Sequence, residues 1–268
     1  MTVSDAIMKR LPGVIRAYVT MYVSLLVFAI VCLTWTLVAL PLLLVLPRGR
    51  GTAIGRLGIQ RGFRLFAGWA SLVGIYRLDL KAIDALRGGP AVILAPNHPT
   101  VIDAILIVTR HPNVVCIMKS ALMNNVLLGA GARLAGYIRN EPPRRMVRES
   151  VAELGRGGLL LVFPEATRTT QSPVNPFVAS VGLIAKLAKV PVQTLIVETD
   201  SPYMSKRHSL LRPVPLPITY RVRLGQRFAA PEDARAFDRS LEAYFRAELA
   251  DSLQRHWLGA GTAPPPAG

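Results

Sequence analysis

The strongest hydrophobic signal in the chain is one long apolar run near its start, because no charged residue occurs from Ala17 through Leu46. A bilayer core needs about 20 apolar residues, so this run predicts a membrane helix, broken near its end by Pro41 and Pro47. A cleaved signal peptide is the competing interpretation. Its apolar region would be shorter, and no small-x-small cleavage site follows here. We therefore expect a retained anchor.

Residues 52–72 have the periodicity of a second, amphipathic helix. Ile59, Phe63, Phe66 and Ala70 are spaced by four, three and four positions and therefore share one helical face. The other face carries Gln60, Arg61, Arg64 and Gly68. The pattern predicts that the apolar face packs and that the polar face meets water or lipid head groups.

Basic residues flank the apolar run on both sides, with Lys9, Arg10 and Arg16 before it and Arg48 and Arg50 after it. The positive-inside rule then favours the cytoplasmic side for both ends, which a re-entrant or interfacial helical hairpin satisfies and a single straight span does not. A plain transmembrane helix followed by a soluble linker helix stays open as the alternative. We expect a membrane location, in a bacterial inner membrane, with the rest of the chain on the cytoplasmic side.

Beyond residue 75 short apolar segments alternate with helical patterns. The expected strands are 76–81, 91–95, 114–118, 158–163, 192–198 and 218–224, and the expected helices are 101–110, 144–155, 177–189 and 231–256. Such alternation predicts an α/β fold with a mostly parallel sheet flanked by helices. We divide the chain into an N-terminal membrane-associated helical region (1–75), an α/β domain (76–258) and a disordered tail (259–268).

Composition supports a membrane setting. The chain is 51% hydrophobic with a mean hydropathy of +0.36, and its formal net charge of +16 favours anionic partners such as a membrane face or phosphorylated substrates. Aromatic residues, at 7%, do not interleave with a basic patch, so nucleic acid is not an expected partner. Cys32 and Cys116 lie in apolar runs and are expected to be buried and free.

The first polar motif follows the expected strand 91–95, where Asn97 and His98 precede Thr100 and Asp103. An aspartate five residues after a histidine, one helical turn into the next element, can hold one imidazole nitrogen and leave the other as a base. A histidine that only caps a helix is the alternative. The other three histidines have no comparable setting, a metal site would need more ligands, and no serine-nucleophile elbow is present.

Two further motifs accompany the first. Glu165, Thr167 and Arg168 follow the expected strand 158–163, and the carboxyl ends of parallel strands meet at one edge of a sheet, so they are expected beside His98. Arg139 begins a basic cluster, which fits an anionic head group or the phosphates of a donor. A surface salt bridge and a solvated charge run are the respective alternatives.

Together these motifs resemble the glycerolipid acyltransferases, whose best-known members are the 1-acylglycerol-3-phosphate acyltransferases. The family's blocks match, in order, Asn97-His98-(4 residues)-Asp103; Gly136, Ile138 and Arg139; Phe163-Pro164-Glu165, Thr167, Arg168 and Thr169; and an apolar segment around Pro191. The match covers about residues 90–195. Two departures are Ala166 where the family has glycine, and Val178-Ala179-Ser180 where it has a basic residue and glycine.

The resemblance implies a membrane-bound O-acyltransferase that moves a fatty acyl group from acyl-CoA or acyl carrier protein to a lipid hydroxyl, chiefly that of 1-acylglycerol 3-phosphate. It implies His98 and Asp103 as catalytic residues. The implied substrate-binding residues are Asn97, Thr100, Arg139, Glu165, Thr167 and Arg168. No metal or cofactor is expected besides the acyl carrier.

Two alternatives remain open. The two departures leave room for a non-glycerol acceptor, such as a lyso-ornithine lipid or an aryl-polyene-type product, and a non-catalytic lipid-binding protein of the same fold is the second. The sequence leaves open the acceptor, the carrier of the donor, the acyl chain length, the membrane topology of the hairpin and the oligomeric state.

Overall fold

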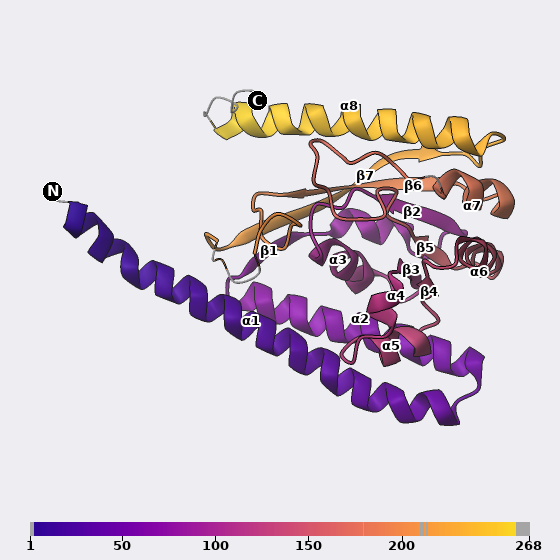
Figure 1. Ribbon diagram of the computed structural model, residues 1–268, viewed down its shortest axis with the longest axis horizontal. Coiled ribbons are helices and arrows are strands. Elements are labelled where there is room, and N and C mark those ends of the chain that lie inside the picture. Colours follow the sequence, from indigo (N-terminus) through magenta and orange to yellow (C-terminus); the bar gives the residue numbers. More distant parts are fainter. Residues whose placement is uncertain (1–2, 179, 210–211, 213, 261–268) are drawn as a thin grey trace.

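The computed structural model describes residues 3–178, 180–209, 212 and 214–260, which form one seven-stranded sheet with helices on both sides (Figure 1). The strands are β1 (Tyr76–Asp79), β2 (Val92–Pro96), β3 (Val114–Met118), β4 (Ile138–Arg139), β5 (Leu159–Leu161), β6 (Val192–Thr199) and β7 (Ile218–Phe228). The helices are α1 (Val3–Val45), α2 (Arg48–Leu72), the 3₁₀ helix η1 (Lys81–Leu86), α3 (Ile102–Arg110), α4 (Ser120–Met123), α5 (Gly129–Leu134), α6 (Pro143–Gly155), α7 (Val181–Ala188) and α8 (Ala234–Ala260).

The strand order is β1-β7-β6-β2-β5-β3-β4, and every neighbouring pair is parallel except β6 and β7. The predicted α/β fold with a mostly parallel sheet is therefore confirmed. Strands β2 and β5, at the centre of the order, are buried over their whole length. Their continuous apolar runs, rather than alternating ones, are what a strand covered by helices on both faces requires.

The N-terminal helices form a hairpin in which α1 and α2 run side by side, on the opposite side of the sheet from α8 (Figure 1). The Phe28 ring of α1 packs on Phe63 and Phe66 of α2, with ring centroids 6.2 Å and 5.0 Å apart. Gln60 was predicted on the polar face, but it is buried against α3. Its side-chain amide donates to the Thr109 carbonyl oxygen (3.2 Å), which satisfies the buried polar group.

The predicted helix break at Pro41 is wrong. Helix α1 continues through Pro41 to Val45, and the chain turns at Pro47 before α2 begins. Ala39, next to this proline, is fully buried in a cluster with Ala130 and Leu134. This packing against α5 stabilises the last turns of α1 despite the N–H that proline lacks.

Other differences concern short elements. The two-residue strand β4 and the helices η1, α4 and α5 were not predicted. The strand expected over 158–163 is only Leu159–Leu161, and the helix expected from residue 177 begins at Val181. Both cysteines are buried and free, as predicted.

The apolar part of α1 is long enough to cross a membrane. Within the described residues it is the single such helix, with 29 residues from Ala17 to Val45, a mean hydropathy of 2.6 and 22% of its most apolar window buried. Because soluble core helices and signal sequences share these properties, this is weak evidence of membrane association. The division of the chain at residue 75 stays a prediction. Of the expected tail, residues 259–260 end α8 and residues 261–268 lie outside the described part of the chain.

Candidate active site

The turn between β2 and α3 places His98 at the carboxyl end of a central strand. The preceding Asn97 is buried, and its carboxamide pairs with both backbone groups of Val197 on β6: Nδ2 donates to the carbonyl oxygen (2.9 Å), and Oδ1 accepts from the N–H (2.7 Å). These bonds tie the end of β2 to its neighbour. The arrangement favours a positioning role for Asn97 over the predicted substrate contact.

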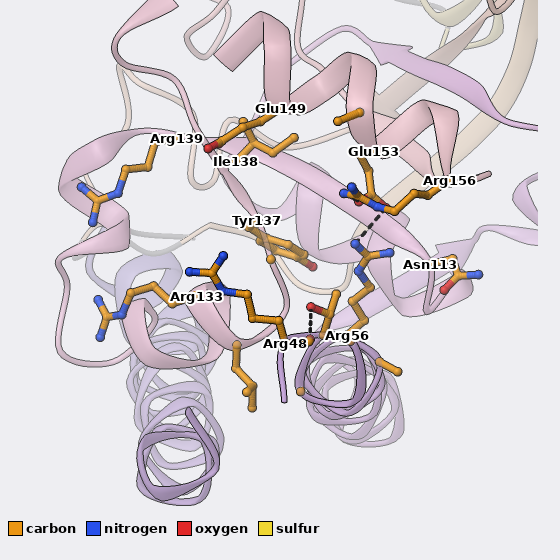
Figure 2. Close-up of a pocket in the computed structure, with 18 of the residues that line it drawn as sticks. Arg48, Arg56, Asn113, Arg133, Tyr137, Ile138, Arg139, Glu149, Glu153 and Arg156 are labelled. Atoms are coloured by element: carbon orange, nitrogen blue, oxygen red, sulfur yellow. Dashed lines mark hydrogen bonds and ion pairs between the residues drawn. The ribbon is translucent and has the colours of Figure 1, made fainter. Parts of the chain in front are cut away.

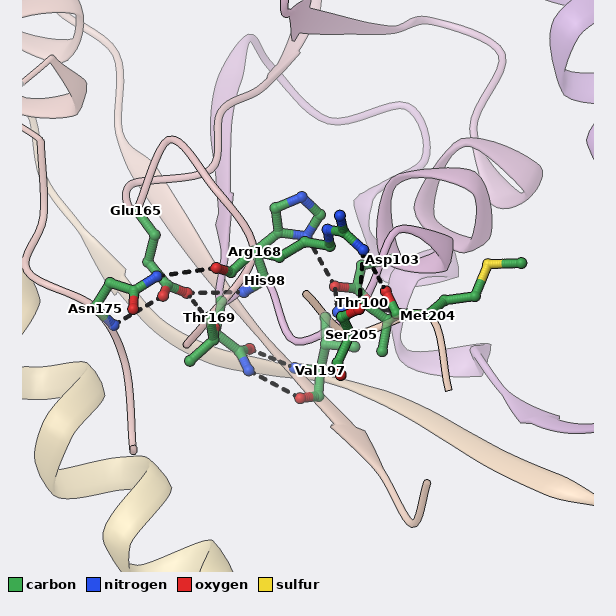
Figure 3. A network of polar contacts seen from close by, with 11 residues as sticks. His98, Thr100, Asp103, Glu165, Arg168, Thr169, Asn175, Val197, Met204 and Ser205 are labelled. Carbon is green, nitrogen blue, oxygen red and sulfur yellow. Dashed lines mark hydrogen bonds and ion pairs between the residues drawn. The ribbon is translucent and has the colours of Figure 1, made fainter. Parts of the chain in front are cut away.

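Asp103, in the first turn of α3, is fully buried and faces His98 (Figure 3). Its Oδ2 lies 2.9 Å from His98 Nδ1 and also accepts the Thr100 N–H (2.8 Å). Its Oδ1 accepts the Thr100 hydroxyl (2.5 Å). Thr100 therefore orients the carboxylate. An imidazole beside a carboxylate carries its proton on the nitrogen that faces it, here Nδ1.

The His98 imidazole also stacks on an aromatic ring. Phe163, after β5, stacks on His98 with ring centroids 3.8 Å apart and ring planes inclined by 24°. The His98 side chain is 16% exposed, and no described residue hydrogen-bonds its Nε2. An imidazole with one nitrogen on a carboxylate and the other open can accept a proton from a hydroxyl. The paired side chains and the free nitrogen have the geometry of a general base with its orienting group.

Glu165 joins the segment after β5 to the backbone of His98 (Figure 3). Its Oε1 accepts the His98 N–H (3.0 Å) and the Thr169 hydroxyl (2.8 Å), and its Oε2 accepts the Asn175 N–H (2.8 Å). Burial raises the pKa of this carboxyl, although these three donors oppose the shift. Among the described residues Glu165 forms no ion pair with Arg168. Its bonds to the His98 and Asn175 N–H groups instead position the turn that carries His98.

Arg168 donates from Nη1 to the carbonyl oxygens of Met204 (2.9 Å) and Ser205 (3.0 Å). The Met204 carbonyl also accepts the N–H of Val101, which immediately precedes α3. Arg168 is thereby fixed beside the His98–α3 turn, as the sequence predicted, and its remaining N–H groups have no partner among the described residues. Thr167 is half-buried in the same segment, and within the described residues its side chain has no hydrogen-bond partner.

Sequence reasoning missed Asn175 and the loop around Met204. The Asn175 carboxamide accepts from the Thr170 and Gln171 N–H groups (3.0 and 3.1 Å) and donates to the Arg168 carbonyl (3.1 Å), which fixes the fold of the whole segment. No local pattern marks either feature, because both act across irregular chain. Phe163 belonged to the recognised motif, but its contact with His98 depends on the neighbouring positions of β2 and β5.

Arg139 lies apart from these residues. It ends β4, which follows β5 and β3 after β2 in the sheet order, so about 14 Å separates β2 from β4 at a spacing of about 4.8 Å. Its guanidinium donates to Asn124 Oδ1 (3.0 Å). It lines a basic cavity that none of His98, Asp103, Glu165 and Arg168 lines (Figure 2). The structure therefore does not bring Arg139 together with the other predicted site residues.

Comparisons with known proteins agree with this geometry. Residues 77–198 match the Acyltransferase family model, and this range contains all the motif residues. The fold resembles the 1-acyl-sn-glycerophosphate (LPA) acyltransferase PlsC from Thermotoga maritima, with a TM-score of 0.64 and 17% sequence identity over 90% of this chain and 97% of that one. At this identity the likeness shows the fold alone. No curated protein matches the sequence.

A histidine with an ordered aspartate at the end of a central strand, inside the matched range, identifies an acyltransferase. The comparisons support the acyltransferase part of the resemblance: residues 77–198 match the acyltransferase domain, and the likeness of fold to PlsC covers 90% of the chain.

Proposed function

We propose that this protein transfers a fatty acyl group from an acyl thioester, on coenzyme A or acyl carrier protein, to the hydroxyl of a lipid, with 1-acylglycerol 3-phosphate as the favoured acceptor. The observation that carries the proposal is the His98–Asp103 pair, with Nδ1 2.9 Å from the carboxylate and Nε2 open. The family match of residues 77–198 supports acyl transfer as the reaction.

In the proposed reaction His98 Nε2 takes the proton of the acceptor hydroxyl as its oxygen attacks the thioester carbonyl carbon. Asp103 stabilises the imidazolium and holds its Nδ1 proton. The tetrahedral intermediate then collapses, the carbon–sulfur bond breaks, and His98 returns the proton to the leaving thiolate. The products are the ester and the free thiol of the carrier. This reaction requires neither an acyl-enzyme intermediate nor a metal.

The acceptor depends on Arg168. A phosphate on the acceptor suits the N–H groups that Arg168 does not use on Met204 and Ser205. An alanine at position 168 should then raise the Michaelis constant for 1-acylglycerol 3-phosphate more than it lowers kcat. An unchanged Michaelis constant would favour a neutral acceptor, such as a lyso-ornithine lipid or an aryl-polyene-type product.

The backbone at Ala166 is relevant to that second acceptor class. Ala166 has φ +52°, in the left-handed region that glycine adopts without strain, and glycine is the residue that the family has there. Its added methyl group is exposed beside Glu165. This change next to the site is the observation that favours an acceptor of different shape.

We infer that the protein acts at a membrane, on the cytoplasmic face of a bacterial inner membrane. One face of α1 packs on the protein, while Leu26, Leu33 and Leu37 on this helix are 59%, 45% and 62% exposed. Such a half-covered apolar helix fits one leaflet of a bilayer, and the positive charge of the chain fits an anionic surface.

The test is incubation of membranes that contain the protein with labelled acyl-CoA or acyl-acyl carrier protein and a panel of lyso-lipids, followed by mass analysis. Phosphatidic acid formed from 1-acylglycerol 3-phosphate supports the favoured acceptor. Acylation of another lipid redirects the assignment within the class. No turnover with any donor and acceptor would favour the non-catalytic lipid-binding alternative.

A further inference from the structure

A basic cavity lies away from the candidate active site, between the α1–α2 turn, β4 and α6 (Figure 2). Its volume is about 1030 Å³. Asn113 and Gly158, which line it, stand just before β3 and β5, whereas His98 follows the carboxyl end of β2. Because β2, β5 and β3 are parallel, part of this cavity lies at the opposite end of the strands from His98.

Arginines dominate the lining. Six arginines and two glutamates, Glu149 and Glu153, leave a formal charge of +4. Both glutamates are already paired: Glu153 with Arg56 (2.8 Å) and Arg156 (2.6 Å), and Glu149 with Arg145 (2.7 Å). The cavity thus contains more guanidinium groups than its own carboxylates can neutralise.

The three other arginines are Arg48, Arg133 and Arg139. None of them has a carboxylate within 4.0 Å among the residues that the structure describes. Arg133 donates to the Met123 carbonyl oxygen (2.7 Å) and Arg139 to Asn124 Oδ1 (3.0 Å), so both keep most of their N–H donors. Like charges facing one cavity repel one another, and a bound anion with several oxygens relieves that repulsion.

The position of the cavity indicates where the anion comes from. Leu44 and Val45, at the end of α1, are 89% and 77% exposed, and Leu43 and Leu46 line the cavity together with Arg48. In a bilayer the phosphate groups lie directly outside the acyl chains. An exposed apolar helix end beside a cluster of arginines matches this arrangement, with the leucines at the acyl chains and the arginines at the phosphates. We propose that this cavity binds the phosphate group of an anionic membrane phospholipid, separately from the acyl acceptor at His98.

Phosphates of a soluble ligand share this chemistry, and coenzyme A is the relevant source. The test therefore uses two ligands on the full chain in detergent. Short-chain phosphatidylglycerol, compared with phosphatidylcholine of the same chain length, probes the lipid, and coenzyme A probes the soluble source. Phosphatidylglycerol is neither a lyso-lipid nor a product of the proposed reaction, so the result does not depend on acyl transfer. Binding is read from the ligand-dependent rise in Tm and from calorimetry.

The cavity variant is Arg48→Gln with Arg133→Gln. Its matched control is Arg61→Gln with Arg64→Gln, which removes the same charge from exposed positions of α2 outside the lining. We expect phosphatidylglycerol to bind the wild type and the control alike and the cavity variant about tenfold more weakly, or worse. If the double variant fails to fold, Arg48→Gln alone serves, because no described side chain bonds the Arg48 guanidinium.

A second outcome is that coenzyme A binds the wild type but not the cavity variant, while phosphatidylglycerol binds neither. This would overturn the phospholipid assignment and show that the phosphate site takes a soluble ligand. Equal losses in the cavity variant and the control would overturn the proposal, because they would reflect the overall charge. Absence of binding by both ligands would overturn it as well.

Discussion

Both carboxylate oxygens of Asp103 accept hydrogen bonds. Oδ2 accepts from His98 Nδ1 and the Thr100 N–H, and Oδ1 accepts from the Thr100 hydroxyl. Asp103→Asn removes the charge that stabilises the imidazolium while keeping the shape of the side chain. We expect kcat to fall on the order of 10⁴-fold. Thr100→Ser, which keeps both donated bonds, is the control and should stay near the wild-type rate. Acyl transfer by a folded Asp103→Asn protein at the wild-type rate would refute the pairing.

Glu165 gives a prediction on pH and stability. Burial raises its pKa above the ordinary 4.5, so between 4.5 and the raised value the folded state binds more protons than the unfolded state. The contribution of Glu165 to the free energy of unfolding is therefore greatest below pH 4.5 and declines as pH rises through the raised pKa. Urea unfolding of wild type and Glu165→Gln across this range should show the wild type losing stability relative to the variant as pH rises. A relative gain would contradict this.

At this scale the sequence predicted the groups but not all of their roles. His98, Asp103 and Arg168 lie where the motifs and the parallel-strand rule placed them. Glu165 and Asn97 were predicted to contact substrate, yet their side chains bond backbone groups of His98 and Val197. Residue type at a strand end indicates a polar site, whereas the direction of each side chain depends on neighbours that only the folded chain supplies.

Among the elements, one tryptophan of α1 fits against two glycines, one on α2 and one on α5. A Cβ added at Gly58 of α2 or at Gly131 of α5 would overlap the Trp35 ring of α1. The glycines therefore form the notch that Trp35 fills. The sequence does not indicate this notch. The long hydrophobic run predicts an apolar helix, but it does not show which of its residues packs against α2 and α5.

Substitutions in α2 test that notch. Gly58→Ala should destabilise the protein by about 1–3 kcal/mol, because overpacking displaces Trp35. Gly68→Ala lies on the same helix with nothing within 4 Å of the added Cβ, so helix propensity alone should stabilise the protein by about 0.5–1 kcal/mol. Thermal unfolding in detergent measures both changes. Shifts of the same sign in the two variants would be inconsistent with the notch.

The sequence predicted six of the seven strands. Of these, β2, β3 and β5 are continuous apolar runs, whereas β1, β6 and β7 include polar or charged residues. The sequence missed β4, which has two residues and forms only by pairing with Ile117 and Met118 of β3. The antiparallel pairing of β6 and β7 was equally hidden, since strand direction depends on the irregular connection between them. Short elements and direction are tertiary properties that local pattern does not encode.

For the whole molecule, the decisive feature is that α1 packs on the rest of the protein from Met21 to Ala39, whereas its N-terminal turns project beyond the sheet (Figure 1). Met21 packs in the main core, Trp35 fills the notch between α2 and α5, and Ala39 is buried against α5. A helix attached in this way leaves one apolar face uncovered, which fits the proposed contact with lipid. It favours the interfacial hairpin over the single span, which would require α1 to leave the protein surface.

Cysteine labelling tests that topology. In a protein with Cys32 and Cys116 changed to alanine, single cysteines at Ser4, Arg50 and Arg64 are treated with a membrane-impermeant maleimide in sealed vesicles. The interfacial hairpin predicts that all three label from the same side. A single span predicts that positions 4 and 50 label from opposite sides of the bilayer. The second result would contradict the hairpin.

The most direct test of the account is acyl transfer by His98→Ala protein in membranes, compared with wild type at equal amounts of folded, membrane-bound enzyme. If His98 is the base that activates the lipid hydroxyl, turnover should fall by about 10²–10⁴-fold, with the protein still folded. Product formation from a labelled acyl thioester, followed by mass analysis, measures it. A His98→Ala protein that retains the wild-type rate would contradict the central claim.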